Sequence, residues 1–273
     1  MKTNQIQLKP LAFLKRDFLI DISYRFKFLL QIAGIFISIL MFFFLSKLIG
    51  VGMANQLGPY GGDYFAFVLI GVAFTDYLSV SLSSFANQIR SAQMMGTLEA
   101  LLVTPTSVPT ILLSSSLYNF AFTSLRVILY LVLGVLLFGL KLHITSLLAF
   151  FVIMAVTILA FSGIGLLSAA FIIVFKEGSP ISYLVGTASG LLGGVIYPVS
   201  VLPSWLKPFA SLLPITHALE AMRQVLLNGA TLIEVYDKIL ALAIFVILLL
   251  PLGLGAFAYG LRMARKEGSL IHY

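Results

Sequence analysis

The chain has 273 residues, of which 60% are hydrophobic and 10% are charged, and its formal net charge is +7. Soluble globular domains carry about 25% charged residues, so this composition indicates an integral membrane protein. The absence of cysteine excludes disulfides, thiolate metal sites and cysteine nucleophiles.

The segment 7–27 mixes apolar and charged residues. Its apolar side chains recur at spacings of three and four, with lysines, arginines and aspartates between them. This pattern predicts an amphipathic helix lying along the membrane surface, and a frayed basic leader is the alternative. The first long apolar run begins only after about 27 charge-rich residues and is longer than the apolar region of a signal peptide, so we expect that it is not a cleavable signal peptide.

Long apolar runs fill most of the remaining chain. A membrane-spanning helix needs an apolar stretch of about 18 residues or more. We count six such runs, at about 28–48, 64–84, 108–140, 144–175, 181–197 and 239–261. The sequence therefore predicts an all-α integral membrane fold of six transmembrane helices, in a single domain spanning residues 1–273.

The basic residues are distributed unevenly between the two predicted sides of the membrane. Eleven of the 17 lysines and arginines fall on one side: six before the first run, three after the last, and Arg90 and Lys176 in loops. Positive charge accumulates on the cytoplasmic side, so both termini are predicted to be cytoplasmic. The basic excess thus reports orientation, and a nucleic-acid partner is not expected.

The segment 88–105, between the second and third runs, is short and mixed in polarity. In a straight helix, one polar edge would hold Arg90, Gln93 and Thr97. Glu99 would then lie about 180° from Arg90, among apolar side chains. A lone carboxylate there is costly unless it is paired, so we expect a turn near Gly96 that brings Glu99 to a cation or to backbone amides. The segment suits docking to another protein at the membrane surface, and a passive loop is the alternative.

Two ionisable residues fall inside the apolar runs, Asp76 in the second and Arg126 in the third. Each costs about 2.5–3.5 kcal/mol at the centre of a bilayer on insertion scales, so both should face protein or a wet cavity. A structural ion pair, a place in a transport pathway, and snorkelling toward the interface all remain open.

Glycines recur at four-residue spacing in the fifth run, at Gly186, Gly190 and Gly194. Such a series lets two helix backbones approach closely in a membrane. The series could form an internal packing face or an interface between subunits.

The region 198–229 is apolar but contains regularly spaced prolines, which prevent a spanning helix. Short re-entrant helices that dip into the outer leaflet and return fit both features. Thr216 is expected to cap the last of these helices, and Gly229 to end it. Glu220 and Arg223, three residues apart, predict a weak surface pair.

Catalytic motifs are absent from the sequence. There is no GxxxxGK[ST] phosphate loop and no GxSxG motif, and the three histidines lie in different regions. The chain is therefore not expected to be an enzyme, nor to bind a cofactor or a metal ion.

Two motifs resemble one membrane-protein family. The run from Gly96 to Pro105 (GTLEALLVTP) looks like the cytoplasmic coupling segment of ABC-2 type transporter permeases. The run from Tyr197 to Leu206 (YPVSVLPSWL) is similar to the extracytoplasmic re-entrant region of the same family. The resemblance extends from the amphipathic segment to the sixth run, and is closest to bacterial drug-exporter, Nod-factor and polysaccharide-exporter permeases.

The resemblance implies that this chain forms the transport path and that separate partner subunits bind ATP. Two permease subunits, expected to be a homodimer, would pair with two separate ATPase subunits that hold ATP and Mg²⁺. An amphipathic or lipid-linked substrate, such as a drug or a glycan, would leave across the cell inner membrane. The coupling element would comprise Gly96, Thr97, Leu98, Glu99, Thr104 and Pro105, with Arg90 and Gln93 on its polar edge, and with Lys176 and Glu177 nearby.

Two other classes compete with this interpretation. An ion-gradient-driven secondary transporter or channel would need no ATPase, but usually has more embedded carboxylates than Asp76 alone. A membrane transferase acting on lipid-linked sugars would need clustered acidic residues or histidines, which the sequence lacks.

Overall fold

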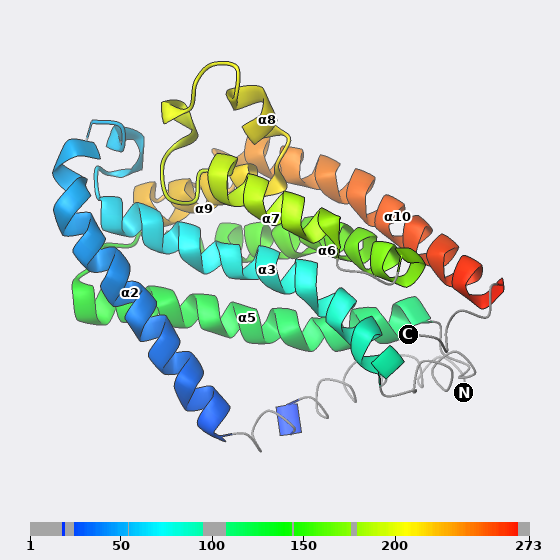
Figure 1. The fold of residues 1–273 in the computed structure, drawn as a ribbon. Coiled ribbons are helices and arrows are strands. Elements are labelled where there is room, and N and C mark those ends of the chain that lie inside the picture. Colours follow the sequence, from blue (N-terminus) through cyan, green and yellow to red (C-terminus); the bar gives the residue numbers. More distant parts are fainter. Residues whose placement is uncertain are drawn as a thin grey trace.

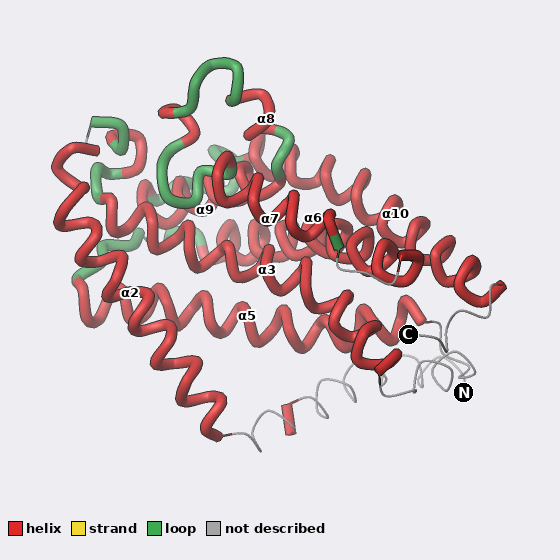
Figure 2. The backbone as a smooth tube through the Cα atoms, viewed as in Figure 1, coloured by secondary structure: helices red, strands yellow, loops and turns green. Residues whose placement is uncertain are grey.

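The computed structural model describes residues 18–19, 25–53, 55–94, 108–143, 145–175 and 179–266. All regular elements in these ranges are helical, as the all-α prediction requires (Figure 1, Figure 2). In chain order they are α2 Arg25–Met53, η1 Gly58–Tyr60, α3 Tyr64–Met94, α5 Val108–Phe138, α6 Leu147–Phe175, α7 Pro180–Leu192, η2 Val199–Val201, α8 Lys207–Ser211, α9 Pro214–Asn228 and α10 Tyr236–Lys266.

Five helices in the described ranges are long and apolar enough to cross a membrane, namely α2, α3, α5, α6 and α10. They correspond to five of the six predicted runs, and the chain is a multi-pass membrane protein. The fifth run forms α7, which has only 13 residues. At 1.5 Å per residue α7 is about 20 Å long, shorter than the hydrocarbon core of about 30 Å. The predicted helix thus ends at Leu192 instead of continuing to Tyr197.

The backbone after Leu192 explains this early end. Gly193 caps the helix, and Gly194 takes the left-handed conformation with φ +76°. A left-handed residue cannot continue a right-handed helix, and Pro198 follows before another turn could form.

Helix α3 is the centre of the bundle. In its most apolar stretch 72% of the residues are buried, against 11% for the corresponding stretches of α2 and α10. It packs against α5, α6, α7, α9 and α2. The most extensive helix pairing is that of α6 with α10, where a Cβ on Gly163 would lie 2.5 Å from the carbonyl carbon of Leu249. Tyr77, Phe74 and Phe85 fill the core around α3.

The connections η1, α5–α6 and α9 gather at one end of the bundle, here called the α9 end. Asn228 of α9 donates to the carbonyl of Pro59 at 2.7 Å, and the amide of His143 donates to the carbonyl of Leu226 at 2.8 Å. The end of α3, the start of α5 and the end of α10 lie at the other end (Figure 1).

The region 198–229 contains the predicted short helices, η2, α8 and α9. Gly229 ends α9 with φ +70°, as predicted. The predicted cap is wrong: α9 begins at Pro214, and the Thr216 hydroxyl donates to the carbonyl of Ala210 at 2.7 Å. Proline suits the first helical position because no intrahelical partner awaits its nitrogen.

Most of the predicted amphipathic helix at 7–27 lies outside the described residues. Phe18 and Leu19 are helical and exposed, and the last three residues of the segment already belong to α2.

Candidate transport and coupling site

The predicted coupling segment begins as a continuation of α3. This helix runs without a break from Tyr64 to Met94, so the second membrane span and the start of the segment form one element of 31 residues. Arg90 is exposed on its last turns, and Gln93 is the last residue but one of the helix. The other predicted coupling residues, Gly96, Thr97, Leu98, Glu99, Thr104, Pro105, Lys176 and Glu177, lie outside the described residues.

The two charged residues within the spans form an ion pair. Arg126 Nη1 of α5 lies 3.2 Å from Asp76 Oδ2 of α3, and about a quarter of each side chain is exposed. The side-chain amide of Gln31 on α2 is oriented with its oxygen toward Arg126. This oxygen accepts hydrogen bonds from Arg126 Nη2 and, at 2.9 Å, from Arg126 Nε. The ion pair that the sequence allowed is therefore present, and it joins three helices.

A small cavity borders this pair. It has a volume of about 40 Å³ and lies between α2 and α5, with Gln31, Phe122 and Arg126 in its wall. A single water needs about 10–15 Å³ by this kind of measure. The cavity has room for a few waters at most, so in this conformation it is not a passage for a large substrate.

A column of polar side chains joins α3 to α5 on the Met94 side of the ion pair. The Tyr77 hydroxyl donates to Ser124 Oγ at 2.8 Å. Ser84 Oγ lies 3.2 Å from Ser116 Oγ and accepts from Asn119 Nδ2 at 2.7 Å. Sequence reasoning missed this column, although serine and asparagine on facing sides of two apolar helices are a usual sign of interhelical hydrogen bonds.

At the α9 end, the buried Arg223 holds three chain segments together. Its Nη1 donates to the carbonyl of Gly194 at 2.7 Å, and its Nη2 to the carbonyls of Val195 and Phe67, both at 3.0 Å. Its guanidinium also lies 3.4 Å from the centre of the Phe67 ring. Arg223 therefore fastens α9 to α3 and to the chain that leaves α7.

The predicted surface pair between Glu220 and Arg223 is wrong, because Arg223 points into the core. Glu220 instead accepts hydrogen bonds from the Tyr60 hydroxyl at 2.6 Å and from Gln224 Nε2 at 3.0 Å. Burial, together with the bond to Glu220, raises the pKa of Tyr60. Burial lowers the pKa of Arg223, yet a guanidinium remains charged at neutral pH.

The three glycines of the fifth run do not share one helix face. Among the described residues, a Cβ on Gly186 would meet only Leu82, at 3.8 Å, and a Cβ on Gly190 would meet nothing within 4 Å. Gly194 lies beyond the end of α7, where Arg223 binds its carbonyl. On α7, Gly190 thus lines an open face, beside the exposed side chains of Leu184 and Leu191.

Residues 11–227 match the family model described as ABC-2 type transporter. The chain belongs to the ABC-2 type transporter family. The match covers well over half of the chain and includes α2 through most of α9. No curated protein matches the chain.

As an ABC-2 family member, the chain is a membrane-spanning subunit of an ABC transporter, and its domain is a transport permease rather than a catalytic one. Permeases of this family generally pair with an ABC ATPase. Among the described residues, no three His, Asp or Glu side chains gather where a metal ion could be held.

Proposed function

We propose that this chain is the permease subunit of an ATP-driven exporter. Two copies pair with two separate ATPase subunits that hold ATP and Mg²⁺. Together they move an amphipathic or lipid-linked substrate, a drug-like molecule or a glycan, outward across the cytoplasmic membrane. The match to the ABC-2 family along residues 11–227 is the observation that carries this proposal.

The unbroken helix α3 offers a route from the ATPase to the membrane interior. Its 31 residues extend over about 46 Å, enough to cross the bilayer and project beyond it. Polar contacts attach it to α5 through Asp76 and Ser84, and at the α9 end its Phe67 carbonyl binds Arg223. A push on the coupling residues beyond Met94 would therefore move several helices together. In this proposal Glu99 is the principal contact, with Lys176 and Glu177 beside it.

The exposed face of α7 around Gly190 supports pairing of two permease subunits. Small residues let helices approach closely in a membrane, and in the described part of the chain no other segment packs against Gly190. The substrate path would then run beside this interface.

The ion pair bears on the rival function, a carrier driven by an ion gradient. A proton-coupled carrier needs an embedded carboxylate that can exchange protons, whereas Asp76 is held by Arg126. This contact favours an ATP-driven permease.

Transport into inverted membrane vesicles that contain the chain and its ATPase tests the proposal. We expect uptake that requires ATP, and we expect Glu99→Gln to abolish uptake while the ATPase stays bound and active. Glu234→Gln is a matched control, because Glu234 is an exposed carboxylate at the α9 end whose hydrogen bonds within the described ranges come from Thr231. Uptake by vesicles without any ATPase would refute the proposal.

A further inference from the structure

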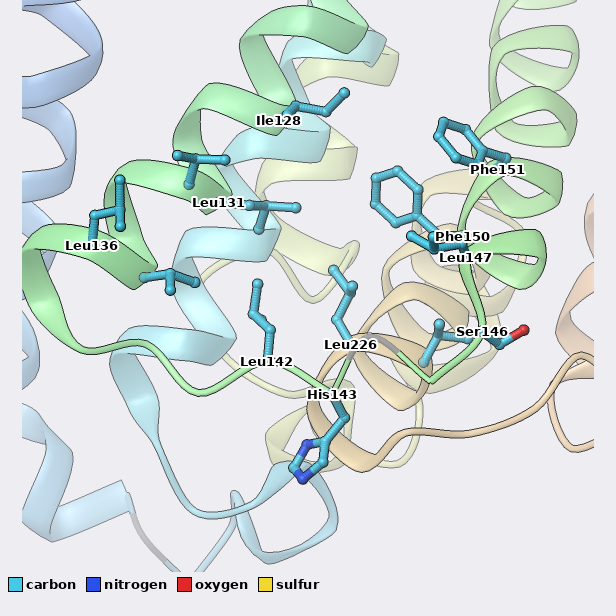
Figure 3. Close-up of a pocket in the computed structure, with 13 residues that line it drawn as sticks. Ile128, Leu131, Leu136, Leu142, His143, Ser146, Leu147, Phe150, Phe151 and Leu226 are labelled. Carbon is cyan, nitrogen blue, oxygen red and sulfur yellow. The ribbon is translucent and has the colours of Figure 1, made fainter.

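An apolar groove lies between α5, α6 and α9 at the α9 end of the bundle (Figure 3). Its volume is about 420 Å³, within the range of about 300–1,000 Å³ that is usual for ligand pockets. Leu131, Val135 and Leu136 of α5 form one wall, Phe150 and Phe151 of α6 form the other, and Leu226 of α9 contributes to the end.

The groove opens sideways, within the membrane. Both walls belong to helices that are candidate spans. The side chains at its edges are well exposed, 73% for Leu136 and 54% for Phe151. Water would not fill an apolar groove of this kind, whereas hydrocarbon chains would. The opening therefore faces the acyl region of the bilayer.

Two polar residues lie at one end of the groove. His143 and Ser146 border it there, and Figure 3 shows the His143 ring directed away from the apolar walls. Lys141 is exposed two residues earlier on the same loop, and no carboxylate in the described part of the chain pairs with it. The bond from the His143 amide to Leu226 fixes this loop against α9. A cation and an imidazole N–H thus lie where the spans end, at the depth of lipid headgroups.

We propose that the groove binds one phospholipid with an anionic headgroup. Its acyl chain lies between α5 and α6, and its phosphate is bound by Lys141 and His143. An apolar groove that ends at His143, with the exposed Lys141 two residues earlier on the same loop, complements an anionic amphiphile in shape and charge. A second copy of the chain fits less well, because the groove takes no residue from α7, which carries the open face around Gly190. The site does not depend on the direction of transport.

Fluorescence quenching by brominated lipids tests the proposal in the full-length chain. The sequence has one tryptophan, so Trp205→Phe gives a silent background. Phe151→Trp then places a reporter in the groove, and Leu136→Trp places a second on the opposite wall. Leu240→Trp is the control. Leu240 lies on α10 and is 45% exposed. Helices α6 and α10 run parallel, because Gly163 packs against Leu249 and Val174 packs against Gly260. Leu240 therefore lies at nearly the same depth in the membrane as Phe151.

The proteins are reconstituted in phosphatidylcholine with a small fraction of brominated phosphatidylglycerol or brominated phosphatidylcholine. We expect both groove reporters to favour the anionic lipid about fivefold, since one basic residue contributes about that factor at a membrane surface. The control reporter should show no preference. Lys141→Gln should remove the preference from the groove reporters.

Equal quenching of the groove reporters by both lipids would overturn the proposal, because the groove would then hold ordinary boundary lipid. Absence of quenching by either lipid would also overturn it, since protein, such as a second copy, would then cover the groove. A preference that survives Lys141→Gln and His143→Gln would overturn the assigned phosphate contact.

Discussion

Arg223 shows how one side chain can support an interrupted helix inside a membrane protein. Backbone carbonyls in the irregular chain beyond a helix end have no intrahelical partner, and in a bilayer each unsatisfied group costs several kcal/mol. Arg223 supplies donors to Gly194 and Val195 just beyond the end of α7. Arg223 also donates to the carbonyl of Phe67 on α3. One turn further along α3, a Cβ on Gly71 would lie 2.2 Å from the carbonyl oxygen of Val195. Glycine at 71 and arginine at 223 are thus both needed for the close packing of α3 against the chain that leaves α7.

Arg223→Met is therefore expected to lower stability by about 3 kcal/mol or more, because hydrogen bonds from charged groups contribute about 1.5–3 kcal/mol each. Arg223→Lys should lie between wild type and Arg223→Met, since an ammonium keeps the charge but cannot reproduce the planar fork. Thermal unfolding in detergent measures the effect. Arg262→Met, at an exposed position of α10, provides the control. Equal stability of Arg223→Met and Arg262→Met would contradict the role assigned to this side chain.

The ion pair between Asp76 and Arg126 predicts a non-additive response. Asp76→Asn or Arg126→Gln alone leaves one charge without its partner, and each should destabilise by about 1–3 kcal/mol, less than for a fully buried pair because both side chains are partly exposed. The double substitution removes both charges and should recover part of that loss.

Denaturation of the four proteins of this mutant cycle measures the coupling. Transport by the double variant then separates the two roles that the sequence left open. A structural pair predicts that transport survives when both charges are absent. If the double variant were stable but inactive, the pair would belong to the transport pathway.

At the scale of elements, α7 shows what composition can and cannot predict. Hydropathy locates α2, α3, α5, α6 and α10 because a long apolar run has few alternatives in a bilayer. It extends α7 too far, because the residues after Leu192 are as apolar as those before. The end of α7 depends on the left-handed Gly194 and on Arg223, 29 residues later in the sequence. No local pattern contains that contact.

The candidate site was predictable to a similar extent. Asp76 and Arg126 were identifiable because charge is rare in an apolar run, whereas their pairing with Gln31 required the packing of α2 against α5. The polar column around Ser84 was missed because serine costs little in a membrane helix and so stands out less than a charge. Arg223 was misjudged because its helix spacing from Glu220 suggested a local pair, while its partners are backbone carbonyls of other segments.

The two kinds of glycine contact predict different effects of added side chains. Gly163→Ala should destabilise the fold, because its Cβ would lie 2.5 Å from the backbone of α10.

Gly190→Leu should leave the fold of the subunit intact, because a Cβ there meets no described residue within 4 Å. If two subunits pair through α7, Gly190→Leu should instead reduce dimer formation. Light scattering in detergent measures the dimer, and thermal unfolding measures the fold. A fully dimeric Gly190→Leu would place the subunit interface elsewhere.

At the scale of the whole molecule, the short helix α7 raises the question of how many times the chain crosses the membrane. If α7 were not a crossing, α10 would start at the Met94 end of the bundle. It starts at the α9 end, because α9 is bound to η1 through Asn228 and through Tyr60. Helix α7 and the chain up to α9 together therefore bring the backbone from one end of the bundle to the other.

This path predicts that Gln56 and Lys266 lie on opposite sides of the membrane. Both residues are exposed, one before α3 and one at the end of α10. The chain has no cysteine, so Gln56→Cys and Lys266→Cys each introduce a single thiol. From the distribution of lysine and arginine, a membrane-impermeant maleimide should label position 56 in intact cells, and position 266 only after permeabilisation. Labelling of both positions in intact cells would mean an even number of crossings between them, and α7 would then lie wholly on one side.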